Sequence, residues 1–133
     1  MTFRLMKKIT TLLAIFLVVN STFAIDVYDE ISSAIRSGDA KQLATFFGPT
    51  IDLTIINRED IYSKAQAEQV IKDFFSKNSP KTFTILHTGS SPEGTLYAIG
   101  NLIATNGKVF RTSFYIKSSG GKNILQELRI ETD

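Results

Sequence analysis

Apolar and polar residues alternate along most of the C-terminal half of the chain, which is the pattern of half-buried β-strands. Four such segments are predicted, at residues 81–88, 95–105, 109–118 and 123–131. The pair Asn106-Gly107 joins two of them and is a strong hairpin signal, because both residues tolerate positive φ. We therefore expect an antiparallel meander in this half of the chain.

The alternation also predicts which side chains of these strands face the core. One set is apolar and is expected to point inward: Phe83, Ile85, Phe110, Phe114, Ile116, Ile124, Leu128 and Ile130. His87, Thr112 and Gln126 share the parity of that set, so we expect them on the same inner face. Glu127 and Arg129 fall in the opposite set and are expected to point outward. A one-residue bulge would reverse these expectations for part of a strand.

Helical spacing and capping residues dominate the segment that precedes the meander. A first helix is predicted to begin after Asp26 and to end at Gly38. A second helix is predicted to begin after Asp39 and to stop at Gly48-Pro49. The two short helices are expected to form a compact helical corner.

The segment between the helical corner and the meander predicts a short hairpin and then a third helix. A strand is expected at residues 51–55 and a brief second strand at Ile61-Tyr62. Ser63 and Gln66 form a capping box, and the apolar stripe of the helix that follows consists of Ala67, Val70, Ile71, Phe74 and Phe75. The fold class predicted from these elements is α+β, with three N-terminal helices packed on a strongly curved, antiparallel sheet.

The N-terminal segment, residues 1–24, has the layout of a secretory signal peptide. A basic head with Arg4, Lys7 and Lys8 precedes an apolar run at residues 12–19, and small residues follow. The run is shorter than the roughly 20 residues that span a bilayer. We therefore expect export to the periplasm or to the outside of the cell, and no membrane anchor after cleavage. A retained N-terminal anchor helix is the alternative.

Composition and charge narrow the class of protein further. The chain contains no cysteine, so neither a lipoprotein anchor nor a disulfide framework is expected. Residues 25–133 have a comfortable length for a single domain. Three of the 15 Lys and Arg residues lie in the predicted signal, which leaves 12 against 13 Asp and Glu and a net charge of −1. A nearly neutral domain gives no electrostatic reason to expect nucleic acid as a partner.

The predicted order of helix, helix, short hairpin, helix and four strands resembles the nuclear transport factor 2-like superfamily, also called cystatin-like. The stretches that carry the likeness are "AIRSGDAKQLATFF", "IYSKAQAEQVIKDFF" and "NILQELRIE". It covers residues 25–131, and it is closest to a group of short, exported bacterial proteins classed as a domain of unknown function. The resemblance implies a conical cavity, in which enzymes of the superfamily place a carboxylate base, often with His or Tyr partners. Because the superfamily hosts many functions, the fold alone does not select one.

The predicted strands do not supply the catalytic groups that such an enzyme needs. A general base must lie within reach of the substrate proton, but Asp52, Glu127 and Glu131 all oppose the apolar parity. His87 is the only histidine, and no carboxylate is placed beside it. With one histidine and no cysteine, the sequence predicts no metal site and no cofactor. No catalytic residue is assigned.

Two groups of candidate binding residues remain. The predicted ligand pocket combines residues of inward parity with one tyrosine: His87, Thr112, Gln126, Phe110, Phe114 and Tyr62. The predicted homodimer face combines apolar residues of outward parity: Tyr97, Ile99, Ile103, Tyr115 and Leu125. Thr112 and Gln126 would either orient a ligand in an apolar cavity or hydrogen-bond to each other. An apolar patch rimmed by charge often marks a protein interface.

The preferred hypothesis is an exported, non-enzymatic domain that binds a small apolar ligand or a partner protein, including a second copy of itself. The first alternative is an isomerase- or dehydratase-like enzyme that uses His87 with a tyrosine. The second is a structural interaction module of the cell envelope. An open cavity lined by Thr112, Gln126 and His87 would favour ligand binding. An interior filled by phenylalanines would favour the structural module, and the candidates for such filling are Phe74, Phe83, Phe110 and Phe114.

Overall fold

Two helices at the start of the described region begin where their capping residues predict. The computed structural model describes residues 26–133, so the predicted signal peptide lies outside the described residues. Helix α2 (Val27–Ser37) begins after Asp26, whose carboxylate accepts a hydrogen bond from the Tyr28 N–H, and ends at Gly38 with φ 66°. Helix α3 (Ala40–Ala44) begins after Asp39, whose carboxylate accepts from the Gln42 N–H.

Helix α3 is shorter than the sequence predicts. The second helix is predicted to continue up to Gly48-Pro49, but Phe47 already begins strand β1 and pairs with Leu125. The expected end of the helix at Gly48-Pro49 is therefore wrong. The reason is long-range, since the backbone of Phe47 is satisfied by the sheet rather than by a further helical turn.

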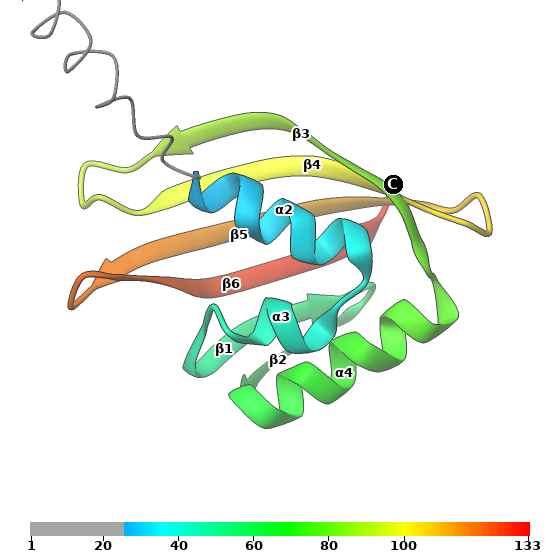
Figure 1. The fold of residues 1–133 in the computed structure, drawn as a ribbon, viewed down its shortest axis with the longest axis horizontal. Helices are drawn as coiled ribbons and strands as arrows, with labels where there is room; N and C mark the ends of the chain where they lie inside the picture. The colour runs from blue at the N-terminus through cyan, green and yellow to red at the C-terminus, as the bar shows by residue number, and fades with distance from the viewer. Residues whose placement is uncertain (1–25) are drawn as a thin grey trace, which may run out of the picture.

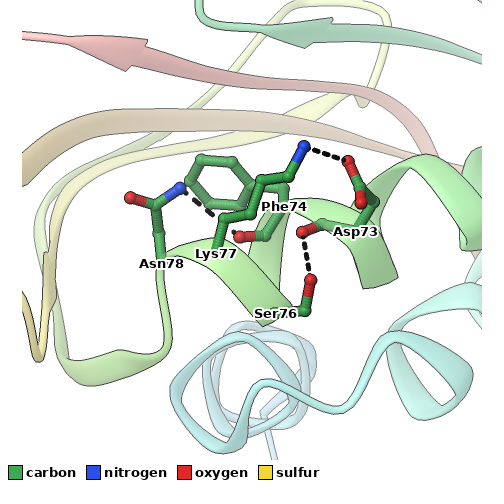
Figure 2. Close-up of polar contacts among 5 residues, drawn as sticks. All are labelled: Asp73, Phe74, Ser76, Lys77 and Asn78. Atoms are coloured by element: carbon green, nitrogen blue, oxygen red, sulfur yellow. Dashed lines mark hydrogen bonds and ion pairs between the residues drawn. The ribbon is translucent and has the colours of Figure 1, made fainter.

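Helix α4 (Lys64–Lys77) carries the predicted capping box. The Ser63 hydroxyl accepts from the Gln66 N–H, and the Gln66 side chain accepts from the Ser63 N–H. Figure 2 shows the last turn of this helix, where Lys77 and Asp73 form an ion pair at 3.1 Å. Both side chains are mostly exposed, so the pair contributes little to stability.

The end of α4 is also tied to the sheet by two asparagines. The Asn78 side-chain amide donates to the Phe74 carbonyl oxygen, as Figure 2 shows. The Asn106 amide donates in turn to Asn78 Oδ1 at 3.0 Å. Asn106 lies in the predicted Asn-Gly turn, so this turn fixes the position of the helix end as well as joining two strands.

Six strands form one sheet in the described residues. They are β1 (Phe47–Ile55), β2 (Arg58–Ser63), β3 (Pro80–Ser90), β4 (Leu96–Ala104), β5 (Val109–Ser119) and β6 (Lys122–Thr132). Their order across the sheet is β2-β1-β6-β5-β4-β3. Strand β1 runs parallel to β6, whereas all other neighbours are antiparallel. The expectation of a purely antiparallel sheet is therefore wrong. Parallel neighbours need a long connection, and the one between β1 and β6 contains α4 and the other four strands.

The three described helices lie on one side of the curved sheet (Figure 1). Helix α2 packs against β3, and α4 packs against β1 and β2. The core lies between these two layers, and its largest fully buried side chains are Phe110, Phe114, Ile31, Ile35, Leu43, Ile51, Leu53, Ile71, Leu102, Ile116, Leu125 and Leu128. We call the helix-facing side of the sheet the inner face and the opposite side the outer face.

A bulge in β6 exchanges the two faces over part of the strand. Tyr115 pairs with Glu127 and Ile116 with Leu125, so Gln126 is the extra residue. Leu125 is consequently 0% exposed in the core. Ile124, which was expected inside, is only half-buried. The predictions that Ile124 points inward and that Leu125 points outward are both wrong, because the bulge inverts the parity.

A second bulge lies in the edge strand β3. Ile85 pairs with Gly100 and His87 pairs with Ile99, so Leu86 is the extra residue. His87 is exposed and pairs with an outer-face residue of β4. The predicted inward orientation of His87 is therefore wrong for the same physical reason.

Gly100 is required where the bulged strand comes close to β4. A Cβ atom at this position would overlap the carbonyl oxygen of Thr84. We expect Gly100→Ala to lower the free energy of unfolding by about 3 kcal/mol, because the obstacle is backbone and cannot rotate away. The measurement is urea denaturation followed by circular dichroism.

The matched control for this prediction is Gly94→Ala. Gly94 has φ 84°, and a Cβ there would meet no atom within 4 Å. This variant therefore incurs only the backbone cost of a left-handed residue, about 1 kcal/mol. Equal losses in the two variants would contradict the proposed close contact of β3 and β4.

Candidate functional site

The interior of the domain is filled by its own aromatic side chains. Phe74, from α4, contacts Phe110, from β5, edge to face with ring centroids 5.0 Å apart. Phe83 and Phe114 are also buried against the same core. All four phenylalanines that the sequence offered as filling are therefore packed in the core.

Thr112 lies at the centre of the inner face but contacts its own strand. It is 0% exposed, and its hydroxyl donates to the Phe110 carbonyl oxygen at 3.3 Å. Gln126 is exposed and lies on the outer side of the β6 bulge. The alternative in which Thr112 and Gln126 hydrogen-bond to each other is thus excluded, because the two side chains lie on opposite faces of the sheet.

The six residues of the predicted pocket do not come together. Phe110, Phe114 and Thr112 are core residues, whereas His87 and Gln126 lie on the exposed side. Tyr62 is half-buried on β2, where it packs against the edge of the core and lines a hollow beside α4. Their roles as ligand contacts stay a prediction that this arrangement does not favour.

The outer face carries an apolar patch. At one end of it, Tyr97 and Tyr115 face each other across β4 and β5 with ring centroids 6.0 Å apart, and Ile103 pairs with Val109 at the other end. We define the outer patch as the apolar side chains of these two strands that point away from the helices: Tyr97, Ile99, Ile103, Val109 and Tyr115. Ile103, Val109 and Tyr115 are each more than one third exposed. Leu125, the fifth member of the predicted dimer face, is not part of it.

Charged residues border the outer patch on β6. Arg129 forms ion pairs with Glu131 at 3.0 Å and with Glu127 at 3.5 Å. The hydrogen bond to Glu131, and then its negative charge, raise the pKa of Arg129 above its ordinary value. These charges lie outside the core, as the sequence predicts for Glu127 and Arg129, and they form a mutual network.

A hollow of about 390 Å³ opens beside the patch, between β1, β6 and β5. We call it the outer hollow. Its lining combines two carboxylates with hydroxyl, amide, apolar and aromatic groups: Thr50, Ile51, Asp52, Ile61, Thr95, Tyr115, Gln126 and Glu127. One carboxylate oxygen, Asp52 Oδ1, is buried and has no hydrogen-bond partner among the described residues.

Sequence reasoning missed the outer hollow because two of its walls depend on non-local pairing. The parallel pairing of β1 with β6 puts Asp52 opposite Glu127. The bulge turns Gln126 to the same side. The local signal for the bulge was the spacing of the two leucines Leu125 and Leu128. They are three residues apart and both buried, and a regular strand does not place residues with this spacing on one face.

Two further findings concern residues 26–133 as a whole. No group of three or more His, Asp or Glu side chains within this region is arranged to hold a metal ion. None of the helices that the structure describes is long and apolar enough to cross a membrane.

Thr112 offers a direct test of whether the inner face serves a ligand. Because its hydroxyl contacts only its own strand, we expect Thr112→Val to change the free energy of unfolding by no more than about 1 kcal/mol. Thermal denaturation and native mass spectrometry of the purified protein check the stability and any retained ligand. A small ligand bound to the wild type and absent from the variant would contradict this account of the interior.

Comparisons with known proteins agree with this architecture. The model of the family described as "Domain of unknown function (DUF4783)" matches residues 28–131. No curated protein matches the chain. A DUF4783 protein from Bacteroides ovatus ATCC 8483 has 26% identity and a TM-score of 0.74, over 82% of this chain and 96% of that one. A second, from Bacteroides uniformis ATCC 8492, has 25% identity and a TM-score of 0.75, over 81% and 98%.

A designed protein of the nuclear transport factor 2 type shares the fold. It has 13% identity and a TM-score of 0.62, over 76% of this chain and 90% of the designed one. This likeness concerns the fold alone. The chain therefore belongs to the DUF4783 family of domains of unknown function, and it has a nuclear transport factor 2-like fold.

Proposed function

We propose that this domain is an exported protein-binding module that recognises its partner through the outer patch. The observation that carries the proposal is the division of aromatic residues between the two faces. Phenylalanines fill the interior, whereas Tyr97 and Tyr115 lie side by side on the face without helices. Phenylalanines packed in the interior take up space that a small apolar ligand would need, and partly exposed tyrosines next to aliphatic side chains are typical of protein interfaces.

The partner to test first is a second copy of this chain. A twofold interface brings the same surface of each copy together, so the surface must be complementary to itself. Both signs of charge occur within and along the border of the outer patch: Arg111 pairs with Asn101 between Ile99 and Ile103, Lys117 lies further along β5, and Glu127 and Glu131 lie on β6. Such a border allows opposite charges to meet when two copies are related by a twofold axis.

We also propose that the module acts outside the cytoplasm. The basic head and the short apolar run of residues 1–24 support cleavage of a signal peptide. The absence of cysteine from the whole sequence supports a chain that is exported without a lipid anchor and is stable through its packed core. In this proposal the exported chain is a single domain, and its three helices cover the inner face of the sheet.

The enzyme hypothesis has less support than protein binding. An isomerase or dehydratase that uses His87 would need this side chain in the interior together with a carboxylate. The exposed His87 at the β3 bulge and the phenylalanine-filled interior both favour a binding role instead.

Ile99 lies at the centre of the outer patch and provides the test. We expect Ile99→Glu to weaken self-association at least about tenfold, because a carboxylate would have to be desolvated in the interface. Sedimentation velocity over a range of protein concentrations measures the dissociation constant. Gln69→Glu is the matched control, since it adds the same charge at an exposed position on α4.

The proposal makes the two variants differ. If Ile99→Glu and Gln69→Glu have the same dissociation constant as the wild type, the outer patch is not the interface. If both weaken association equally, the effect is one of net charge rather than of the patch.

A further inference from the structure

The outer hollow borders the outer patch and shares Tyr115 with it. A partner protein seated on the patch would therefore also cover the hollow. Its volume of about 390 Å³ is at the small end of the range for binding pockets. The hollow is thus suited to one side chain of a partner rather than to a large ligand.

The carboxylates of the hollow are arranged at a cost to the isolated domain. Asp52 on β1 lies directly opposite Glu127 on β6. Like charges in directly opposite positions destabilise a sheet, and the lining contains neither Lys nor Arg. Glu127 has Arg129 as an ion-pair partner at 3.5 Å.

Asp52 has the unsatisfied group. Its Oδ1 atom is buried without a hydrogen-bond partner among residues 26–133, although a buried polar atom normally has one. A positively charged donor in the hollow would compensate the charge of the Asp52 carboxylate, which lines it, and would remove the repulsion between Asp52 and Glu127.

The other walls indicate what kind of cation fits. Ile61 and the ring of Tyr115 present apolar and aromatic surface, on which the methylene stem of a long side chain packs and which attracts a flat cation. A hard metal ion would instead require about six or more oxygen ligands. The guanidinium group of arginine combines a planar cation with several donors in a fixed fork.

We propose that the outer hollow binds an arginine side chain of the partner protein, with Asp52 as the main acceptor and Glu127 as the second. The inference rests on the proposed function, because the partner delivers this side chain when it covers the outer patch. The bulge completes the site, since it turns Gln126 outward beside Glu127, so that both side chains line the hollow. Charge-assisted hydrogen bonds of this kind are about twice as strong as neutral ones.

The probe is N-acetyl-arginine amide, titrated into the isotope-labelled protein and followed by amide chemical shifts in NMR spectra. We expect saturable shifts at Asp52, Gln126 and Glu127, with a dissociation constant in the millimolar range, roughly that of a single side chain. N-acetyl-citrulline amide has nearly the same shape but no charge, and it is expected to bind at least about tenfold more weakly.

Two substitutions separate the site from a general charge effect. Asp52→Asn is expected to weaken binding of the arginine probe at least about tenfold, whereas Glu93→Gln, in the exposed β3–β4 connection, leaves it unchanged. Asp52→Asn is also expected to keep or raise the melting temperature, because it removes a repulsion between carboxylates. Glu127→Gln provides a second variant with a smaller loss of binding, since Arg129 already shares that carboxylate.

The outcomes that overturn the inference are specific. Equal binding of the two probes, unchanged binding in Asp52→Asn, or shifts spread over the helices instead of the hollow would each reject it. The titration needs no partner, so it is independent of the test of the outer patch. If Ile99→Glu leaves association unchanged while the arginine probe still binds through Asp52, the proposed function fails and the cation site stands.

Discussion

The register of β6 is the constraint on which both faces of this domain depend. This strand lies in the middle of the sheet, parallel to β1 on one side and antiparallel to β5 on the other. Its extra residue, Gln126, allows Leu125 and Leu128 to enter the core although they are three positions apart. A regular strand would bury Ile124 instead and would turn Gln126 inward. One inserted residue therefore decides both the packing of the interior and the polar lining of the outer hollow.

The packed interior makes the outer face of the sheet, rather than the inner face, the better candidate for a binding surface. In the conical arrangement a large side chain from a helix and one from the sheet can meet in the middle, and here Phe74 and Phe110 do so. Burial of such rings contributes strongly to stability, and their loss would leave a costly cavity. A sheet packed in this way has one face committed to the core, and the partly exposed side chains of Tyr97 and Tyr115 lie on the other.

The sequence predicts the local features of the fold well and the non-local ones poorly. Asp26 and Ser63 cap helices as expected, because a cap depends on residues within one turn. The bulges at Leu86 and Gln126 escape prediction because parity arguments assume uninterrupted alternation, and each bulge reverses everything beyond it. The parallel pairing of β1 with β6 joins segments more than 70 residues apart, as in Asp52 and Glu127, so no local pattern announces it. The two bulges separate His87 and Gln126 from the other residues of the candidate pocket, whereas four of the five outer-face residues lie where alternation puts them.

The edges of the sheet favour the proposed association through the outer face over the addition of a strand at an edge. An open edge strand invites pairing with another chain, and proteins usually protect such edges with charge or with a bulge. The edge strand β2 exposes Arg58, Glu59 and Asp60 in succession, and β3 contains the bulge at Leu86. Exposed apolar residues do occur on both edges, and Ile61 on β2 is 68% exposed. The charged residues that precede Ile61 and the bulge in β3 nevertheless disfavour the addition of a continuous strand. A partner that instead covers the outer face would meet backbone groups that are already paired, aromatic surface and the two carboxylates of the outer hollow. It would therefore gain side-chain contacts without disrupting the sheet.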